Sequence, residues 1–436
     1  MIDKNQKLYK QARKIIPNGT MLFSKKPELY LPGKWPTYFS KAKKAHVWDL
    51  ENNKYLDMYF GVGQNTLGYA NKEVDESVIK SNRSGNMSSL NSYQEVYLAK
   101  KLINIHKWAG LIRFAKSGGE ANSISIRFAR AISGKDKIAI CGYHGWHDWY
   151  LAANLKSKKK LNDHHIKELK VEGVPKVLRN TIFPFRMNNF EDFEKIKKID
   201  DLGAIKMEVY REKEPDIKFL RDIRKFCNKN KIILIFDECT SGFRESYGGI
   251  HLNYRVYPDL MVLGKAIGNG YPITAVLGKK KYLNKTSNCF ISSTFWTEKS
   301  GSVAALKTLE IMKRDKTFIK IKKIGKNIKN IWSKLSKKHN LKIKIYGLDS
   351  IPCLQFLSKK HLIYKTYLTQ EMLKNKILAT NQVYVSISHN KTHLNRYKKI
   401  LDKIFKSISN FEKNNTPKKN ILKTKICEVG FKRYTN

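Results

Sequence analysis

Short apolar runs alternate with helix-like segments between about residues 55 and 310, and this alternation limits the possible folds more than any other feature. The runs with the composition of buried strands are KIAIC (137–141), AIKMEVY (204–210), KIILIFDE (231–238), DLMVLG (259–264) and ITAVLG (273–278). The segments 120–133 and 217–230 repeat apolar residues at helical spacing. Strands that alternate with helices form a mainly parallel sheet covered on both faces. The sequence therefore predicts an α/β fold.

The two ends of the chain follow another pattern, in which longer helix-like segments lie beside short strand-like ones. The helix-like segments are 311–338, 362–375 and 391–412, and the strand-like ones are CLQFL (353–357) and VYVSIS (383–388). A chain of 436 residues exceeds what one small core supports. We therefore expect a large domain over residues 55–310 and a smaller α+β domain built from residues 1–54 and 311–436.

The charge of the chain bears on which partners it can bind, because its formal net charge is +48. Such a balance is typical of proteins that bind nucleic acid. Here, however, lysines dominate over arginines and fall between the apolar residues of amphipathic segments such as 321–339, where they face solvent. We expect small-molecule partners and no nucleic acid, although the positive field can steer acidic substrates.

The expected location follows from the absence of targeting patterns. No apolar run approaches the roughly 18 residues that span a bilayer, and the N-terminus has no signal-peptide pattern. Six cysteines are scattered without a C-x-x-C pair, which favours free thiols in a reducing compartment. We expect a cytoplasmic protein with no membrane partner. The adjacent His164 and His165 lie in a lysine-rich segment, where we expect a solvated loop rather than a metal site.

Candidate functional residues lie where the predicted strands end, and ligands of open α/β sheets bind outside those carboxyl ends. The residues at these ends are Tyr143 after the first run, Glu208 late in the second, Asp237 at the end of the third and Lys265 after the fourth. Asp237 and Lys265 lie one strand–helix–strand step apart, so their side chains can face one pocket.

Lys265 follows an apolar run and precedes a glycine-rich turn. An ammonium group in such a place loses hydration, which disfavours its charged form and suits an amine nucleophile. The alternative is a lysine at a strand end that extends to water.

The segment SGGEAN gives a second candidate. Ser117, Gly118 and Gly119 stand directly before a predicted helix, where free backbone N–H groups and the helix dipole attract an anion such as phosphate. The alternative is an ordinary turn with Ser117 as the N-cap.

The remaining candidates are aromatic or acidic. Tyr143 lies among glycines and could stack on a planar ring or pack in the core. His144 could donate a hydrogen bond to a ligand or be a structural histidine. Asp237 ends an apolar strand, where a carboxylate is costly to bury without a cation. A protonated pyridine nitrogen would be such a partner, and an N-cap or a salt bridge is the alternative.

One ligand, pyridoxal 5′-phosphate (PLP), suits a phosphate site, a stacking ring, a buried carboxylate and a desolvated lysine together. The chain also resembles the class III (fold type I) PLP-dependent aminotransferases, most closely the glutamate-1-semialdehyde aminomutase branch. The stretches that carry this resemblance, in family order, are YLDMYFGVGQNTLGYAN, SGGEAN, YHGWHD, FDECTSGFR, GKAIGNGYPITAVLG and SSTFWTEKSGSVAAL.

The resemblance implies a seven-stranded, mainly parallel sheet in the large domain and a role for each matching residue. Lys265 would hold PLP as a Schiff base, Asp237 would pair with the ring nitrogen, and Tyr143 would stack on the ring beside His144. Backbone amides at Ser117, Gly118 and Gly119 would hold the phosphate. Thr294 would reach the phosphate from the neighbouring subunit, which implies a homodimer with shared active sites. Glu208 matches a glutamate near the cofactor, although the family's following proline is Val209 here.

The implied activity is transfer of an amino group from a donor such as glutamate to a carbonyl acceptor such as a keto-sugar, with the freed Lys265 as general base. The alternative is a glutamate-1-semialdehyde 2,1-aminomutase, which makes 5-aminolevulinate. That branch carries an N-terminal serine and arginine near the substrate carboxylate. Here Lys25 takes the arginine's approximate place, and Leu22 or Phe23 takes the serine's. Because lysine lacks the planar fork that grips a carboxylate, we expect slow or absent isomerisation.

Overall fold

The computed structural model describes residues 3–157 and 159–429. The described chain separates into two units: unit 1 holds residues 3–71 and 319–429, and unit 2 holds residues 72–318. Both divisions fall later in the chain than the expected ones after residues 54 and 310. One reason is that β3 (Lys54–Asp57) pairs in parallel with β13 (Ile377–Leu378), so the chain beyond residue 54 is bonded to the C-terminal segment.

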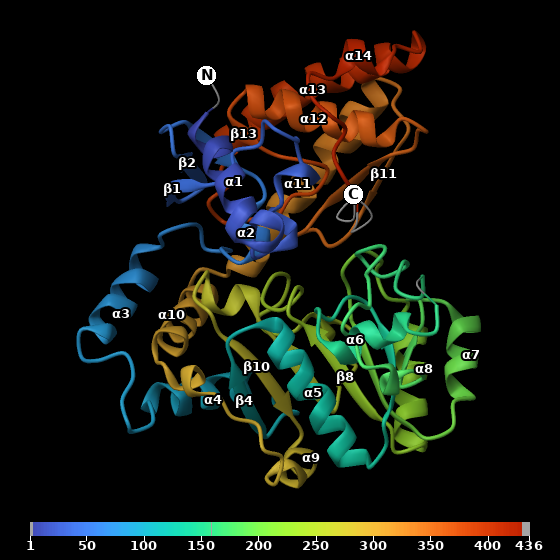
Figure 1. The fold of residues 1–436 in the computed structure, drawn as a ribbon. Coiled ribbons are helices and arrows are strands. Elements are labelled where there is room, and N and C mark those ends of the chain that lie inside the picture. The colour runs from blue at the N-terminus through green and yellow to red at the C-terminus, as the bar shows by residue number, and fades with distance from the viewer. Residues whose placement is uncertain (1–2, 158, 430–436) are drawn as a thin grey trace. The chain divides into compact units, whose positions relative to one another are not determined.

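Unit 2 is built on a seven-stranded sheet with the order β4-β10-β9-β8-β7-β5-β6 (Figure 1). Its strands are β4 (Leu111–Ala115), β5 (Lys137–Cys141), β6 (Ile182–Pro184), β7 (Leu202–Glu208), β8 (Ile233–Glu238), β9 (Leu260–Leu263) and β10 (Thr274–Gly278). Neighbouring strands pair in parallel from β9 to β6, whereas β10 is antiparallel to β9 and to β4. The predicted mainly parallel α/β sheet is confirmed.

Helices cover this sheet because its strands are apolar on both faces. The helices of unit 2 are α3 (Lys72–Asn82), α4 (Tyr93–Ile105), α5 (Gly118–Ser133), α6 (Asp148–Leu151), α7 (Phe190–Lys197), α8 (Ile217–Lys229), α9 (Lys280–Leu283) and α10 (Ser300–Arg314). Helix α5 lies across β7 to β10 (Figure 1). Its buried Ile124 and Phe128 join strand residues such as Ile235 in one apolar core. Every residue of β7 and β8 is buried, so polar side chains on these strands need a specific reason.

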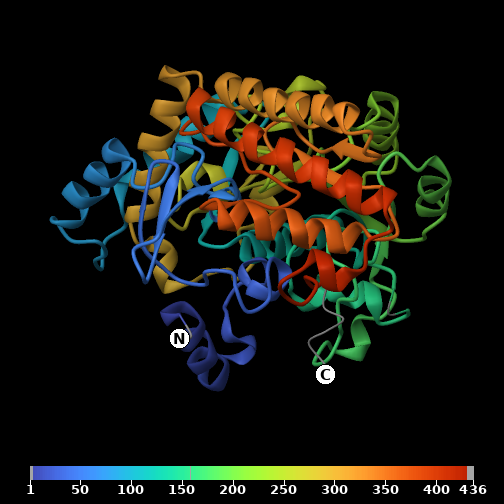
Figure 2. The same cartoon turned by 90° about the horizontal axis from the view of Figure 1, so that it is seen from above.

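Unit 1 contains a four-stranded sheet with the order β1-β2-β3-β13 and a two-stranded sheet of β11 and β12. The further strands are β1 (Phe39–Lys43), β2 (His46–Asp49), β11 (Ile343–Tyr346) and β12 (Cys353–Phe356). Its helices are α1 (Lys4–Ile15), α2 (Phe60–Gly63), α11 (Thr317–Lys338), α12 (His361–Lys374), α13 (Lys391–Lys413) and α14 (Lys418–Ile421). Helices α12 and α13 pack side by side, as Figure 2 shows in orange and red.

Two predictions for the C-terminal segment were wrong. The segment 311–338 is not one helix, because α10 ends at Arg314 and Lys316 adopts a left-handed φ of +47° before α11 begins. The run VYVSIS is not a strand, and its last two residues lie in a turn. Its backbone N–H groups donate to Pro352, Met58 and Ser350, which come from different parts of unit 1 and form no continuous ladder.

Two further features bear on location. No helix among the described residues is long and apolar enough to cross a membrane. The six cysteines are free thiols, and all except Cys289 are buried.

Candidate active site

The predicted phosphate segment forms the beginning of α5. The Oγ of Ser117 accepts the N–H of Glu120 at 3.4 Å, and Oε2 of Glu120 accepts the N–H of Ser117 at 2.8 Å. This capping box fixes the first turn and leaves the N–H groups of Gly118 and Gly119 outside the helix's own hydrogen-bond ladder. A Cβ on Gly119 would lie 2.9 Å from Nε2 of His147, so a larger residue there would displace the imidazole. Ser117 is thus an N-cap, and the turn behind it presents N–H donors to an anion.

Glycine also shapes the loop after β5. Gly142 has a φ of +112°, and a Cβ there would lie 2.7 Å from Oε2 of Glu208. The turn brings the N–H of Tyr143 to 3.0 Å from the same carboxylate oxygen. Burial raises the pKa of the Tyr143 phenol, although the nearby Arg211 opposes this. Tyr143 is therefore held, as a neutral phenol, at the carboxyl end of β5.

Asp237 and His144 form a buried pair. Nδ1 of His144 lies 2.8 Å from Oδ2 of Asp237, and Oδ1 of Asp237 accepts the N–H of Cys239 at 3.0 Å. Burial opposes ionisation of Asp237. The hydrogen bond from His144 and the charge of Lys206 outweigh this and hold the pKa of Asp237 below its usual range. Asp237 is therefore an anion, and His144 positions it.

Lys265 begins η7 (Lys265–Gly268), directly after β9. Its backbone has a left-handed φ of +38°, which is strained for a residue with a side chain. Nζ donates to Oγ1 of Thr240 at 2.7 Å, and Thr240 is buried. Burial, followed by the charge of Arg211, lowers the pKa of Lys265 to about 8. The amine therefore ends at a buried hydroxyl rather than in bulk water, and a sizeable neutral fraction exists near neutral pH.

A second buried lysine lies in β7, and the sequence analysis missed it. Lys206 is fully buried and shares a sheet face with Glu208, because the two are separated by one residue of a strand. Its Nζ donates to Oγ of Ser125 on α5 at 3.0 Å. Burial lowers the pKa of Lys206 to about 8 despite the charge of Asp237, which raises it. The signal for this residue was the one that identified Lys265, a lone lysine in an apolar run.

The buried ammonium group of Lys206 leads to a prediction about how stability depends on pH. In wild type the folded pKa is about 8 against an ordinary 10.5, so the unfolded chain binds more protons at Lys206 between these values. Stability contributed by this site is therefore lowest below pH 8 and rises from pH 8 to about 10.5, by on the order of 3 kcal/mol. Lys206→Met should unfold at a higher temperature than wild type at pH 7, and the difference should shrink as the pH rises to 10. A difference that grows with pH would contradict this account.

Arg211 was also missed, because it lies in an irregular loop after β7. Its Nη1 donates to Oε1 of Glu208 at 3.2 Å, and its Nη2 lies 2.8 Å from Nε2 of His165. His165 in turn lies 3.1 Å from Oε1 of Glu212 through Nδ1. Glu208 therefore holds both the Tyr143 loop and Arg211. The sequence pattern indicated only the nearby Glu208, which lies at the end of an apolar run.

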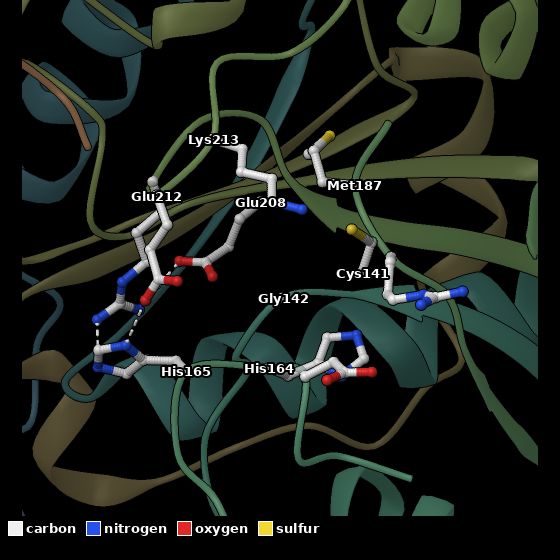
Figure 3. A pocket seen from close by; sticks show the side chains of 11 residues that line it. Cys141, Gly142, His164, His165, Met187, Glu208, Glu212 and Lys213 are labelled. Atoms are coloured by element: carbon white, nitrogen blue, oxygen red, sulfur yellow. Dashed lines mark hydrogen bonds and ion pairs between the residues drawn. The ribbon is translucent and has the colours of Figure 1, made fainter. Parts of the chain in front are cut away.

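A cavity of about 340 Å³ lies beside this loop, and we name it the Arg211 cavity (Figure 3). His164 and His165 line one side in this view, opposite Glu208, Glu212 and Lys213. The prediction of a solvated loop is wrong for His164, which is buried with Nε2 at 3.1 Å from the carbonyl of Phe185. No cluster of His, Cys, Asp or Glu among the described residues could hold a metal ion.

Thr294 lies apart from this arrangement. It begins η9 (Thr294–Thr297) on an exposed part of unit 2, between the exposed aromatic residues Phe290 and Phe295. One chain therefore presents Thr294 on its surface.

The residues present fit PLP. The first turn of α5 would receive the phosphate, and the anionic Asp237 would keep a proton on the pyridine nitrogen. Tyr143 would lie against the ring, and Lys265 would supply the amine for the aldehyde. All of these residues belong to unit 2, at the carboxyl ends of β5, β8 and β9 or at the beginning of α5.

Comparison with known proteins agrees with this fit. The family model of class-III aminotransferases matches residues 32–351. A 3-aminobutyryl-CoA aminotransferase of Cloacimonas acidaminovorans is 31% identical over 377 residues, covering 84% of this chain and 87% of the relative. A glutamate-1-semialdehyde 2,1-aminomutase of Methanosphaera stadtmanae is 29% identical, covering 91% of this chain and 96% of the relative.

Solved structures show the same fold. The FumI protein of Sphingopyxis sp. MTA144, in a form with PLP, superposes with a TM-score of 0.85 at 22% identity and covers 96% of this chain and 100% of its own. A glutamate-1-semialdehyde aminomutase of Pseudomonas aeruginosa PAO1 gives a TM-score of 0.79 at 16% identity, covering 92% and 94%. The fold is thus that of fold type I PLP enzymes. With the match over residues 32–351, the chain belongs to the class-III aminotransferase family and is a PLP-dependent enzyme.

Proposed function

We propose that this aminotransferase moves an amino group from a donor such as glutamate to a carbonyl acceptor of the keto-sugar type, with Lys265 as the residue that binds PLP and transfers the proton. The observation that carries this proposal is the position of the Lys265 amine after β9, 2.7 Å from the buried hydroxyl of Thr240, in the same unit as Asp237. At the carboxyl end of β9 the neutral fraction of this amine, larger than that of an ordinary lysine, can act both as nucleophile and as base.

The chain's own residues then have separate tasks. The bound cofactor supplies an electron sink for the substrate carbon. Asp237, held by His144 and the N–H of Cys239, keeps its negative charge beside that sink and stabilises a proton there. Lys265 would remove a proton from the substrate carbon and hold it on Nζ for return to the reacting molecule. The hydroxyl of Thr240, 2.7 Å from Nζ, holds the amine between these transfers.

An aminomutase is the second candidate, supported by the relative in Methanosphaera stadtmanae. Against it stands the N-terminal stretch, in which Lys25 ends η2 (Phe23–Lys25) where the aminomutase branch has an arginine. We expect the purified holoenzyme to convert glutamate-1-semialdehyde to 5-aminolevulinate slowly or not at all.

An assay of 5-aminolevulinate measures this directly, with glutamate and a keto-sugar in a parallel reaction. Lys25→Arg is the informative variant, because it restores the planar fork and should increase any residual isomerisation. Efficient isomerisation by wild type would establish the aminomutase instead.

We further propose a homodimer with shared active sites. Support comes from the exposed apolar side chains of unit 2, which do not suit contact with water. They include Leu90, Tyr93, Tyr97, Phe290 and Phe295, exposed by 82%, 64%, 55%, 82% and 70%. Thr294 lies between the last two in sequence and would reach the phosphate of the second copy.

Thr294→Ala should weaken PLP binding by about tenfold to a hundredfold, because a hydrogen bond to a charged phosphate is lost. Equilibrium dialysis of PLP measures this, with Thr297→Ala as the control in the same short helix. The protein should sediment as a dimer or a larger assembly. An active monomer would contradict the shared site.

The location that we propose is the cytoplasm. The six free thiols support a reducing compartment, because none is joined in a disulfide.

A further inference from the structure

The Arg211 cavity adjoins the residues proposed to react. Gly142 and Glu208 line it, and Glu208 also accepts the N–H of Tyr143 at 3.0 Å. The ring of His165, another lining residue, lies 5.9 Å from the ring of Tyr143. Arg211 lines the cavity and is also close enough to Lys265 to lower its pKa. A substrate bound beside Tyr143 can therefore extend part of its structure into this space.

The charges of the cavity wall balance. The carboxylates in the lining belong to Asp163, Glu208 and Glu212, and the cations to Arg186, Arg211 and Lys213. Burial lowers the pKa of His164 and of His165, so both are neutral near neutral pH. Arg186 is already bonded to Asp192 through Nε at 2.7 Å and Nη2 at 2.9 Å. The wall therefore carries no excess of positive charge that would attract a phosphate or a carboxylate.

The hydrogen bonds of the wall fix its donors and acceptors. Because Arg211 donates to Nε2 of His165, the proton of that ring lies on Nδ1 and is directed to Glu212. The ring of His164 carries its proton on Nε2, which faces the carbonyl of Phe185. Its Nδ1 is then an acceptor without a partner among the described residues, although His164 is only 4% exposed. A ligand that brings hydrogen-bond donors would match the carboxylates of the wall.

We propose that the Arg211 cavity binds an uncharged, hydroxyl-rich part of the carbonyl acceptor, such as a sugar ring. Each hydroxyl group both donates and accepts, so it matches a wall in which carboxylates, guanidinium groups and imidazoles alternate. The volume of about 340 Å³ falls within the range of small-molecule sites, from roughly 300 to 1,000 Å³. This inference rests on the proposed aminotransferase function and assigns the hydroxyl-rich part of the acceptor to a defined cavity.

Binding without turnover gives the first test. Saturation-transfer NMR on the PLP-bound protein would use methyl α-D-glucopyranoside as the neutral probe and succinate as the anionic one. The glucoside should show transfer in wild type and lose most of it in Glu212→Gln and Asp163→Asn. Glu194→Gln is the matched control, because Glu194 lies on α7 and pairs with the neighbouring Lys197. No glucoside transfer in wild type, or transfer to succinate alone, would overturn the proposal.

The acceptor half-reaction gives the second test and separates this inference from the proposed function. The enzyme in its amino form would be mixed with a hexos-3-ulose or with 4-oxobutanoate, and the return of the yellow form followed. Glu212→Gln should raise the half-saturating hexosulose concentration about tenfold, as expected for a lost hydrogen bond to a charged group. The same variant should affect the half-reaction with glutamate less.

Failure of the cavity inference and failure of the proposed function give different results. If wild type reacts with glutamate but Glu212→Gln and wild type saturate alike with the hexosulose, the cavity does not bind the acceptor. If wild type does not react with glutamate or any other amino donor, the proposed function itself fails.

Discussion

Lys265→Ala should fold and lose turnover by at least about 10⁴-fold, because one amine is asked to bind the cofactor and to move the proton. Cofactor bound to this variant should not become covalently linked on borohydride reduction. The measurement is the initial rate of amino transfer together with the mass of the reduced protein. Circular dichroism would establish that the variant is folded.

Lys229→Ala is the matched control for this variant, since Lys229 is an exposed lysine at the end of α8. It should retain both the rate and the covalent link. If reduction still links cofactor to Lys265→Ala, another lysine binds PLP. The buried Lys206 would then be examined first, because its pKa is also lowered to about 8.

Asp237→Asn should retain some cofactor but lose about a thousandfold or more of the rate. The amide keeps the shape of the carboxylate, and it cannot supply the negative charge that holds a proton on the ring nitrogen. The measurement is the rate at which an amino donor deuterated at its α-carbon loses that deuterium, because this is the step at which the carbanion forms.

Asp259→Asn is a suitable control, because Asp259 is also a buried carboxylate, bonded to Arg224 and Lys279. This change should cost stability while the folded enzyme keeps its rate. A rate near wild type in Asp237→Asn would mean that the Asp237–His144 pair serves the fold alone.

Five of the seven strands of unit 2 could be predicted from the sequence because each is a short apolar run. The strands β4 and β6 were not predicted, since β4 contains Arg113 and β6 has only three residues. The run 231–238 became β8, and its last residues still carry Asp237 as expected. Pairing direction could not be predicted in the same way. ITAVLG has the composition of its parallel neighbours, and it is antiparallel because residues 264–273, which link β9 to β10, hold only the short η7 and no crossover α-helix.

Side-chain partners were harder to predict than strand positions. Nothing in the sequence pairs His144 with Asp237, which are 93 residues apart, or His165 with Arg211, which are 46 apart. These contacts arise because β5, β7 and β8 are neighbours in the sheet. Lys206 is different, because the sequence itself shows a lone lysine within the apolar run AIKMEVY. Its place inside the strand, away from the strand ends where ligands of α/β sheets bind, gave no indication of a site.

The central claim is that Lys265 is the amine that binds PLP in this chain. The most direct measurement is reduction of the purified wild-type protein with borohydride, followed by proteolysis and mass spectrometry of the labelled peptide. The account predicts that a single peptide carries the reduced cofactor and that fragmentation places it on Lys265. A label on any other lysine, or a yellow protein that yields no labelled peptide, would contradict it.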